Sequence, residues 1–158
     1  MRRNKEIQKK RDKYRKSVFG VAYCKDNDGK IEYIILKRKK HWKGWEFPKG
    51  KIEKFETKKG AVKREVHEET GLKILKVKRF EEKGVYLYHK KLWDRPNVIG
   101  QTYRLFGVEV KKGDGKASLD KIEHNGYKWV NFQEAQKTLT WPNQKKCLKI
   151  VNDWLKKK

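Results

Sequence analysis

The sequence predicts an α+β domain in which a mixed β-sheet lies between helices, an α/β/α sandwich. Three observations lead to this: strand-type segments on both sides of a central charged stretch, a helical pattern inside that stretch, and a helical pattern near the C-terminus. The chain has 158 residues and no linker that would divide it, so we expect one domain over residues 17–158. Its hydrophobic content is only 35%, but six Trp, seven Tyr and six Phe supply a packed interior.

The first strands are expected in residues 17–37. Residues 17–24 (SVFGVAYC) are β-branched, aromatic and small, and residues 31–37 (IEYIILK) repeat that character. Residues 26–29 (DNDG) between them have the composition of a tight turn. The segment therefore predicts a β-hairpin. Pro48 then disfavours helix at Phe47 and predicts an extended approach to Gly50.

The second half of the chain adds more strands and two helices. We expect strands over 73–84, 85–93, 101–110 and 127–132, separated by a loop at 94–100 and a mobile Gly- and Lys-rich loop at 111–121. A short helix is expected over 133–139, a break at Pro142, and a last helix ending at Leu155.

The central stretch, residues 50–72, predicts a helix with carboxylates on one side. Thr57 is a plausible N-cap and Gly71 a plausible residue just beyond the helix end, where glycine adopts positive φ freely. Glu65, Glu68 and Glu69 stand at i, i+3 and i+4, which brings their side chains together. Converging carboxylates suit a hard divalent cation that takes oxygen ligands.

The same stretch resembles the sequence signature of the Nudix family. Gly50, Glu56 and then residues 64–72 (REVHEETGL) match the Nudix box at all nine of its specified positions, and residues 45–49 (WEFPK) resemble the lead-in common in the family. The resemblance implies the Nudix fold. It also implies hydrolysis of a pyrophosphate bond in a nucleoside diphosphate linked to another group, with Mg²⁺ or Mn²⁺ as cofactor.

The resemblance also implies which residues form the site. The carbonyl of Gly50 and the carboxylates of Glu65, Glu68 and Glu69 match the metal ligands, and Glu56 matches a position with a structural role. Arg64 matches the arginine that orients the first glutamate, against the alternative of a surface ion pair. A catalytic glutamate outside the box is matched best by Glu123, six residues before Trp129, although it would also suit a solvated loop. The candidates are catalytic Arg64, Glu65, Glu69 and Glu123, with Glu109 and the pair Glu81 and Glu82 as runners-up for Glu123.

The charge favours an anionic partner. With 44 basic and 20 acidic residues the net charge is +24, which attracts nucleotide polyphosphates or RNA, although lysine-rich solubility accounts for it equally well. Residues 1–16 form a basic N-terminal arm, either a phosphate-binding segment or a solvated leader. The expected substrate contacts are Arg38, Trp42, Lys49, Tyr88 and Tyr103.

Two markers outside the box address the substrate. Tyr88 lies sixteen residues past Leu72, a position that is tyrosine in dinucleoside polyphosphate hydrolases of the family, although alternate tyrosines also suit a strand core. Gly100 and Gln101 resemble the related RNA 5′-pyrophosphohydrolases. The leading hypothesis is hydrolysis of a diadenosine-tetraphosphate-type substrate. The alternatives are removal of pyrophosphate or a cap from RNA 5′ ends, or a non-catalytic nucleotide- or RNA-binding scaffold.

The remaining signals concern the cell compartment. Cys24 and Cys147 fit no metal or redox spacing, and Cys24 is expected in the core. No run approaches the ~18 apolar residues of a transmembrane span, and the N-terminus has no apolar signal core. We expect a cytoplasmic protein without a membrane partner; the sequence does not indicate an oligomeric state.

Overall fold

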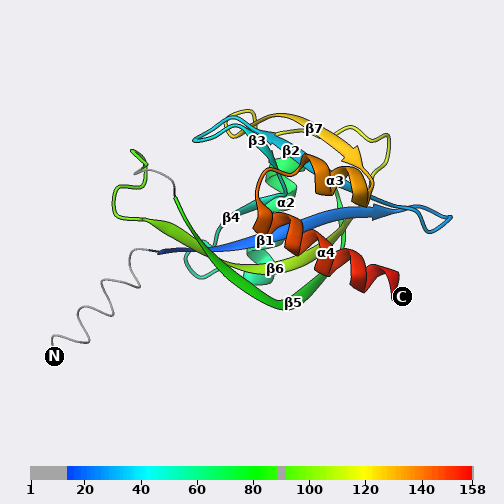
Figure 1. The fold of residues 1–158 in the computed structure, drawn as a ribbon, viewed down its shortest axis with the longest axis horizontal. Helices are drawn as coiled ribbons and strands as arrows, with labels where there is room; N and C mark the ends of the chain where they lie inside the picture. The colour runs from blue at the N-terminus through cyan, green and yellow to red at the C-terminus, as the bar shows by residue number, and fades with distance from the viewer. Residues whose placement is uncertain (1–13, 89–91, 158) are drawn as a thin grey trace.

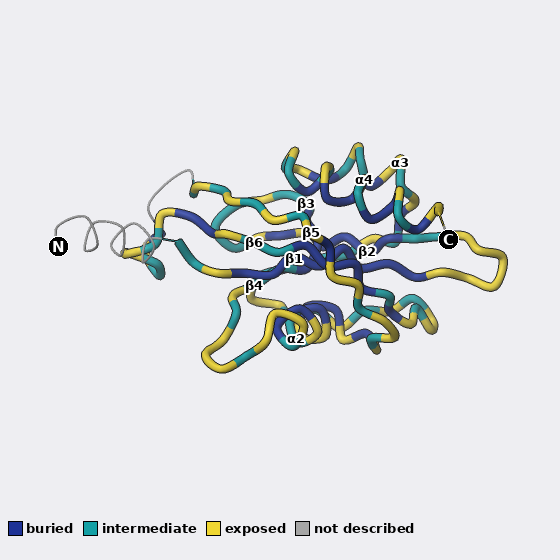
Figure 2. Tube along the Cα trace, turned by 90° about the horizontal axis from the view of Figure 1, so that it is seen from below, coloured by how far each residue is buried: buried dark blue, intermediate teal, exposed yellow. Residues whose placement is uncertain are grey.

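The computed structural model describes residues 14–88 and 92–157, and there it shows a mixed β-sheet covered by helices on both faces (Figures 1 and 2). The predicted α+β sandwich is confirmed. The strands are β1 (Tyr14–Lys25), β2 (Ile31–Arg38), β3 (Gly44–Glu46), β4 (Lys49–Lys51), β5 (Ile74–Leu87), β6 (Gly100–Val110) and β7 (His124–Val130). The helices are α2 (Lys58–Thr70), α3 (Phe132–Thr138) and α4 (Pro142–Lys156).

Strand β1 is the centre of the sheet. Residues 17–24 are all buried, because the strand is covered on both faces. It turns into β2 through Asp26, whose Oδ1 accepts hydrogen bonds from the amides of Asp28 at 2.9 Å and Lys30 at 2.8 Å. The predicted hairpin is therefore confirmed. It starts at Tyr14, so residues 14–16 of the predicted arm belong to the sheet, and residues 1–13 lie outside the described part.

The order of the main path is β3-β2-β1-β6-β5, with β4 paired to β1 and β7 paired to β2. β1 and β6 run parallel, whereas β1 pairs antiparallel with β2 and β4. Helix α2 lies on one face and helices α3 and α4 on the other (Figure 2). Each face has its own core: Val18, Ile34 and Val66 belong to the core on the α2 side, and Phe19 and Leu148 to that on the α4 side.

Strand β5 corrects one prediction. Residues 73–84 and 85–93 were expected to form two strands, but one strand runs from Ile74 to Leu87, antiparallel to β6, with a register shift between Arg79 and Lys83. Gly84 was expected to end the first of these strands. It instead pairs with Tyr103, and a side chain at position 84 would collide with the tyrosine ring. The glycine therefore permits close packing within a continuous strand.

The helices begin and end close to the predicted positions. In α2, Thr57 Oγ1 accepts a hydrogen bond from the Gly60 amide at 3.0 Å, and Gly71 follows the helix in the left-handed conformation with φ 69°. Pro142 does not merely break the chain: it is the first residue of α4, where its missing N–H costs no hydrogen bond. No helix in the described ranges is long and apolar enough to cross a membrane.

Candidate active site

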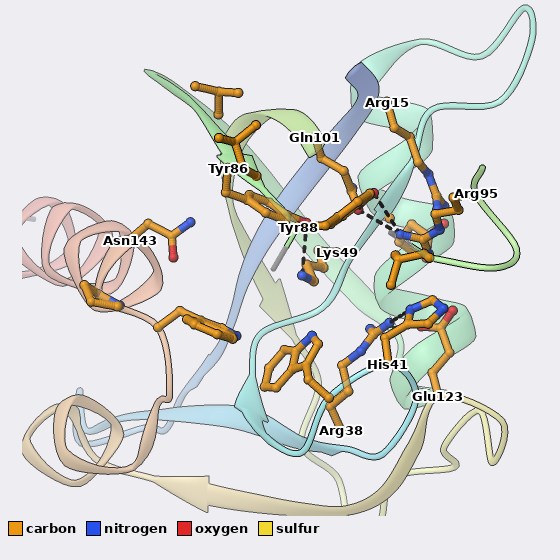
Figure 3. Close-up of a pocket in the computed structure, with 18 residues that line it drawn as sticks. Arg15, Arg38, His41, Lys49, Tyr86, Tyr88, Arg95, Gln101, Glu123 and Asn143 are labelled. Atoms are coloured by element: carbon orange, nitrogen blue, oxygen red, sulfur yellow. Dashed lines mark hydrogen bonds and ion pairs between the residues drawn. The ribbon is translucent and has the colours of Figure 1, made fainter. Parts of the chain in front are cut away.

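A cavity of about 380 Å³ opens where β1, β4, β5, the start of α4 and the loop after β2 come together (Figure 3). It brings together box residues, cations and aromatic side chains that are far apart in the sequence. Lys49 lies between Tyr86 and Tyr88 on one side and Arg38 on the other (Figure 3). The residues that line the cavity include Gly50, Glu65 and Glu123, the cations Arg15, Arg38, Lys49 and Arg95, and the aromatic residues Trp42, Tyr86, Tyr88 and Trp141.

Two of the predicted carboxylates, Glu65 and Glu123, line this cavity, and the buried Glu69 lies close to both. Glu69 is 2% exposed; its Oε2 accepts a hydrogen bond from the Lys49 amide at 3.1 Å, and its Oε1 is buried without a hydrogen-bond partner among the described residues. Glu69, Glu123 and His124 each offer a ligand atom, and these atoms lie within 4.8 Å of one another. Glu65 lines the cavity beside Gly50, where any larger side chain would collide with the Glu65 carboxylate.

The pKa values of these carboxylates indicate crowded negative charge. Burial raises the pKa of Glu65 to about 7, against the opposing effect of Arg64. Burial, followed by the neighbouring Glu46, Glu65 and Glu123, raises the pKa of Glu69 well above its ordinary value. Buried oxygens that lack enough cationic partners fit a divalent cation with oxygen ligands. The carboxylates of Glu65 and Glu69 are therefore suited to a hard divalent cation, with the Gly50 carbonyl as the further ligand expected from the sequence.

Glu68 differs from the other two box glutamates. Its side chain is 54% exposed and contacts Arg64 Nη1 at 3.2 Å, whereas Glu65 is 14% and Glu69 2% exposed. Arg64 itself donates from Nη1 to Glu65 Oε1 at 2.7 Å, the contact expected of an arginine that orients the first glutamate. The structure thus places Arg64 against both Glu65 and Glu68, and Glu68 is the most exposed of the three box glutamates.

Glu123 lines the cavity, whereas the runner-up candidates for the glutamate outside the box do not. Its backbone carbonyl accepts a hydrogen bond from the Lys39 amide at 2.9 Å, and its Oε2 lies 3.6 Å from Arg38 Nη1. Glu109 lines a different cavity, next to Tyr23. Glu81 is almost fully exposed and Glu82 pairs with Lys146 at 3.1 Å, and neither lines the cavity beside Glu65.

A buried charge network holds the cations of the cavity in place. Glu46 is fully buried; its Oε1 lies 2.9 Å from both Arg38 Nη1 and His124 Nε2, and its Oε2 lies 3.5 Å from Lys49 Nζ. Burial alone would raise the pKa of Glu46, but Lys49, the hydrogen bond from His124 and Arg38 together lower it to about 2. The sequence offered Glu46 only as part of the lead-in to the box, so its role was missed.

The predicted substrate contacts divide into two groups. Arg38, Trp42, Lys49 and Tyr88 line the cavity. Lys49 Nζ donates to the Tyr86 hydroxyl at 3.0 Å and lies 4.8 Å from the centre of that ring. Tyr103 does not line the cavity: its ring packs beside Phe19 and Tyr86, at centroid distances of 5.9 and 6.3 Å.

Several further residues of the cavity were not identified from the sequence, among them two arginines, a tryptophan and an asparagine. Arg15 and Arg95 add positive charge, and Arg95 Nη1 donates to the Tyr88 hydroxyl at 2.9 Å, which in turn donates to Gln101 Oε1 at 2.8 Å. Trp141 packs edge-on against Trp42 with ring centroids 5.3 Å apart, and Asn143 follows it at the start of α4. For Arg15 the basic composition of residues 1–16 was a usable signal; for the others only the fold brings them near the box.

The sequence matches known proteins over most of its length. A family model described as the NUDIX domain matches residues 14–149. An RNA pyrophosphohydrolase from a Nitratiruptor species is 34% identical over 149 residues, which is 90% of this chain and 94% of that protein. The RNA pyrophosphohydrolase of Vibrio vulnificus (strain YJ016) is 31% identical over 130 residues, 77% of this chain and 73% of that protein.

Solved structures resemble this fold at lower sequence identity. A NUDIX hydrolase from Listeria monocytogenes has a TM-score of 0.71 at 21% identity, covering 89% of this chain and 94% of that one. A C. elegans Ap4A hydrolase, solved as a binary complex, also has a TM-score of 0.71 at 21% identity, covering 91% of this chain and 99% of that one. At this identity the likeness shows the shared fold.

Proposed function

Since this chain belongs to the NUDIX family and is a pyrophosphohydrolase, we propose that its substrate is the 5′ end of RNA, from which it releases pyrophosphate. The observation that carries the proposal is the relative at 34% identity over nine tenths of the chain, an RNA pyrophosphohydrolase. The sequence markers placed a diadenosine-tetraphosphate-type substrate first and RNA 5′ ends second, and the proposal reverses that order.

The cations of the cavity support a polyphosphate substrate. Arg15, Arg38, Lys49 and Arg95 all line it, and Arg38 is only 5% exposed. Guanidinium and ammonium groups bind phosphate oxygens through charge-assisted hydrogen bonds, which strengthen where water is excluded. Glu46 holds Arg38 and Lys49 in place, so these two groups are positioned to contact the phosphates of a substrate.

The chain's own residues have distinct roles in the proposed reaction. Glu65, Glu69 and the Gly50 carbonyl would hold Mg²⁺ or Mn²⁺, with Glu68 more exposed than either glutamate; such an ion, when bound, offsets phosphate charge and acidifies a water ligand. Arg38 and Lys49 orient the phosphate chain. Glu123, held next to Arg38, accepts a proton from the attacking water. Tyr88 and Trp42 present rings on which a base can stack.

A specific observation favours a dinucleoside polyphosphate as the second candidate. The cavity has two separate aromatic groups: Trp42 with Trp141, and Tyr86 with Tyr88, whose ring centroids are 6.3 Å apart. Two stacking positions on either side of the cations would accept a nucleoside at each end of a phosphate chain.

The experiment is a substrate panel with purified protein in Mg²⁺ or Mn²⁺. It compares 5′-triphosphorylated RNA, capped RNA, diadenosine tetraphosphate, ADP-ribose and 8-oxo-dGTP. We expect the highest kcat/KM on triphosphorylated RNA, with pyrophosphate as product and no turnover after the cation is chelated. A higher kcat/KM for diadenosine tetraphosphate would overturn the proposal in favour of the second candidate. Glu69→Gln serves as the inactive control, which excludes a contaminating phosphatase.

A further inference from the structure

Phe55 is the most exposed of the large hydrophobic residues in the described ranges, at 97%. Its backbone is left-handed, with φ 65°, a conformation that bulky side chains rarely adopt. The only other non-glycine residue with positive φ in the part of the chain that the structure describes is His41, which lines the active-site cavity. Strained backbone of this kind gathers at functional sites, where the surrounding structure enforces it.

The turn that carries Phe55 is held firmly by hydrogen bonds. The Glu53 amide donates to Glu56 Oε1 at 3.0 Å, and the Glu56 amide donates to the Glu53 carbonyl at 3.1 Å. The Glu56 carboxylate is bound in turn by Arg64 of helix α2 at 2.8 and 2.9 Å. The aromatic ring is thus presented to solvent on a hydrogen-bonded turn between β4 and α2.

The surroundings of Phe55 are basic. Lys54 Nζ lies 5.3 Å from the centre of its ring, and Lys51, Lys58 and Lys59 are exposed on the same loop and the first turn of α2. Of the two acids in the loop, Glu56 is neutralised by Arg64. An exposed aromatic ring among lysines is the arrangement that binds single-stranded nucleic acid, with the ring stacking on a base and the lysines contacting phosphates.

The loop continues directly from the active site. Gly50 lines the cavity, and the carbonyl of the next residue, Lys51, accepts a hydrogen bond from Arg64 Nη2 at 2.9 Å. A chain whose 5′ end occupies the cavity and whose body leaves past Gly50 would meet Lys51 first and Phe55 next. A substrate short enough to remain in the cavity would meet neither.

We propose that residues 51–59, the Phe55 loop, bind the RNA chain downstream of its 5′ end, with Phe55 stacking on an unpaired base and Lys51, Lys54 and Lys58 contacting phosphates. The inference rests on the proposed function, because it assigns a second contact to the same substrate. It makes the enzyme sensitive to RNA length, and the strained conformation of Phe55 is maintained for that contact.

The test measures kcat/KM on triphosphorylated RNAs of two nucleotides and of about 12 nucleotides, a length within the usual range of single-strand sites. Phe55→Ala should lower kcat/KM on the longer RNA about fivefold or more and leave the dinucleotide unchanged, because only the longer chain reaches the ring. Phe55→Tyr keeps an aromatic ring and should restore the wild-type value. Leu75→Ala, at a residue 50% exposed on β5, is the control and should behave as wild type on both RNAs.

A glycine variant separates the strain from the contact. Phe55→Gly should raise the Tm, since glycine adopts positive φ without a steric penalty, and should show the same defect on the longer RNA as Phe55→Ala. A Tm that rises without any loss on long RNA would show that the residue has no role in binding.

The outcomes distinguish this inference from the proposed function. If the wild-type protein releases no pyrophosphate from either RNA, the proposed function fails. If it acts on both, and Phe55→Ala equals wild type at both lengths, only the loop inference fails. An equal loss on both lengths would mean that the change acts on the cavity through Arg64, which also overturns the inference.

Discussion

Arg64 binds Glu56 through two parallel hydrogen bonds, Nε to Oε2 at 2.8 Å and Nη2 to Oε1 at 2.9 Å, while its Nη1 reaches Glu65 Oε1 at 2.7 Å. One guanidinium therefore fixes both the loop before α2 and the first carboxylate of the candidate metal site. A planar fork with several donors is required for this, and an ammonium group cannot reproduce it.

Arg64→Lys should lower kcat and destabilise the fold by about 1–3 kcal/mol, because it leaves the carboxylates of Glu56 and Glu65 without their paired donors. Steady-state kinetics and a thermal melt check both effects. Arg79→Lys, at an exposed position of β5, is the matched control and should be silent. A wild-type kcat in Arg64→Lys would remove Arg64 from the catalytic group.

Glu69→Gln should reduce kcat about a hundredfold or more and weaken Mn²⁺ binding in calorimetry, because it removes a buried ligand oxygen. The resemblance assigned Glu68 and Glu69 alike as metal ligands, which would imply an equal loss for Glu68→Gln. The exposure of Glu68 now leads us to expect a smaller loss there. Mn²⁺ affinity unchanged in Glu69→Gln would contradict its assignment as a ligand.

Glu123→Gln should reduce kcat more than it raises KM, since the amide cannot accept the proton of the attacking water. Glu109→Gln is the matched control, because Glu109 lies in another cavity. The assignment would be reversed if the control lost activity and Glu123→Gln kept it.

The metal-free protein should become less stable as pH rises. The pKa of Glu65 is about 7 in the folded protein, raised by burial from its ordinary value near 4.5, so the folded state binds the proton more tightly than the unfolded chain. The resulting stability is fully present below pH 4.5 and is lost as pH rises through 7. Between about pH 5 and about pH 8 we expect a loss of about 1–3 kcal/mol, reduced in Glu65→Gln, when denaturation is followed in a chelator.

Adding Mg²⁺ or Mn²⁺ at about pH 8 should restore stability to the wild-type protein, because the cation replaces the proton as partner of the carboxylates. Glu65→Gln should gain less from the cation. If the free energy of unfolding of the metal-free wild type does not change between about pH 5 and about pH 8, and equals that of Glu65→Gln, the raised pKa of a buried Glu65 is contradicted.

Tyr88→Ala should weaken substrate binding by about 1–3 kcal/mol if a base stacks on the ring. Tyr88→Phe keeps the ring but loses the hydroxyl that contacts Gln101 and Arg95, so it separates stacking from hydrogen bonding. KM for RNA in the two variants provides the measurement. Equal KM values for Tyr88→Ala and wild type would exclude stacking at this position.

Deleting residues 2–13 should weaken RNA hydrolysis and flatten its dependence on salt, because fewer counterions are released on binding. Hydrolysis of a dinucleoside tetraphosphate should change little. The check is kcat/KM against salt concentration for both substrates, in the intact and truncated proteins. An equal loss of activity on both substrates would mean that the arm supports the folded enzyme in general and does not bind RNA specifically.

The sequence predicted the elements whose signals are local. The caps of α2 at Thr57 and Gly71 and the turn at Asp26 depend on residues within a few positions of one another, and each is confirmed. The box glutamates follow from spacing along one helix, although spacing did not reveal that Glu68 is exposed while Glu69 is buried. That difference depends on what packs against each side of the helix.

The parts of the site that were missed depend on distant pairing. The parallel register of β1 and β6 places Arg15 opposite Gln101, and no local pattern links these two positions. Trp141 reaches Trp42 only because α4 packs across the sheet. Glu46 looked like one more acid in a highly charged chain, and only its complete burial among Arg38, Lys49 and His124 distinguishes it.

The place of β1 at the centre of the sheet also constrains how the chain can be made. Its parallel partner β6 begins at Gly100 and ends at Val110, so on the ribosome the first strand emerges long before that partner exists. Until then the buried residues of 17–24 have β2, β4 and helix α2 to cover them, but neither β6 nor helix α4. Pairings so distant in sequence form slowly, and exposed strands of this kind promote aggregation. A nascent chain stalled before Gly100 should therefore be insoluble or chaperone-bound, whereas one released after Lys156 can close its sheet.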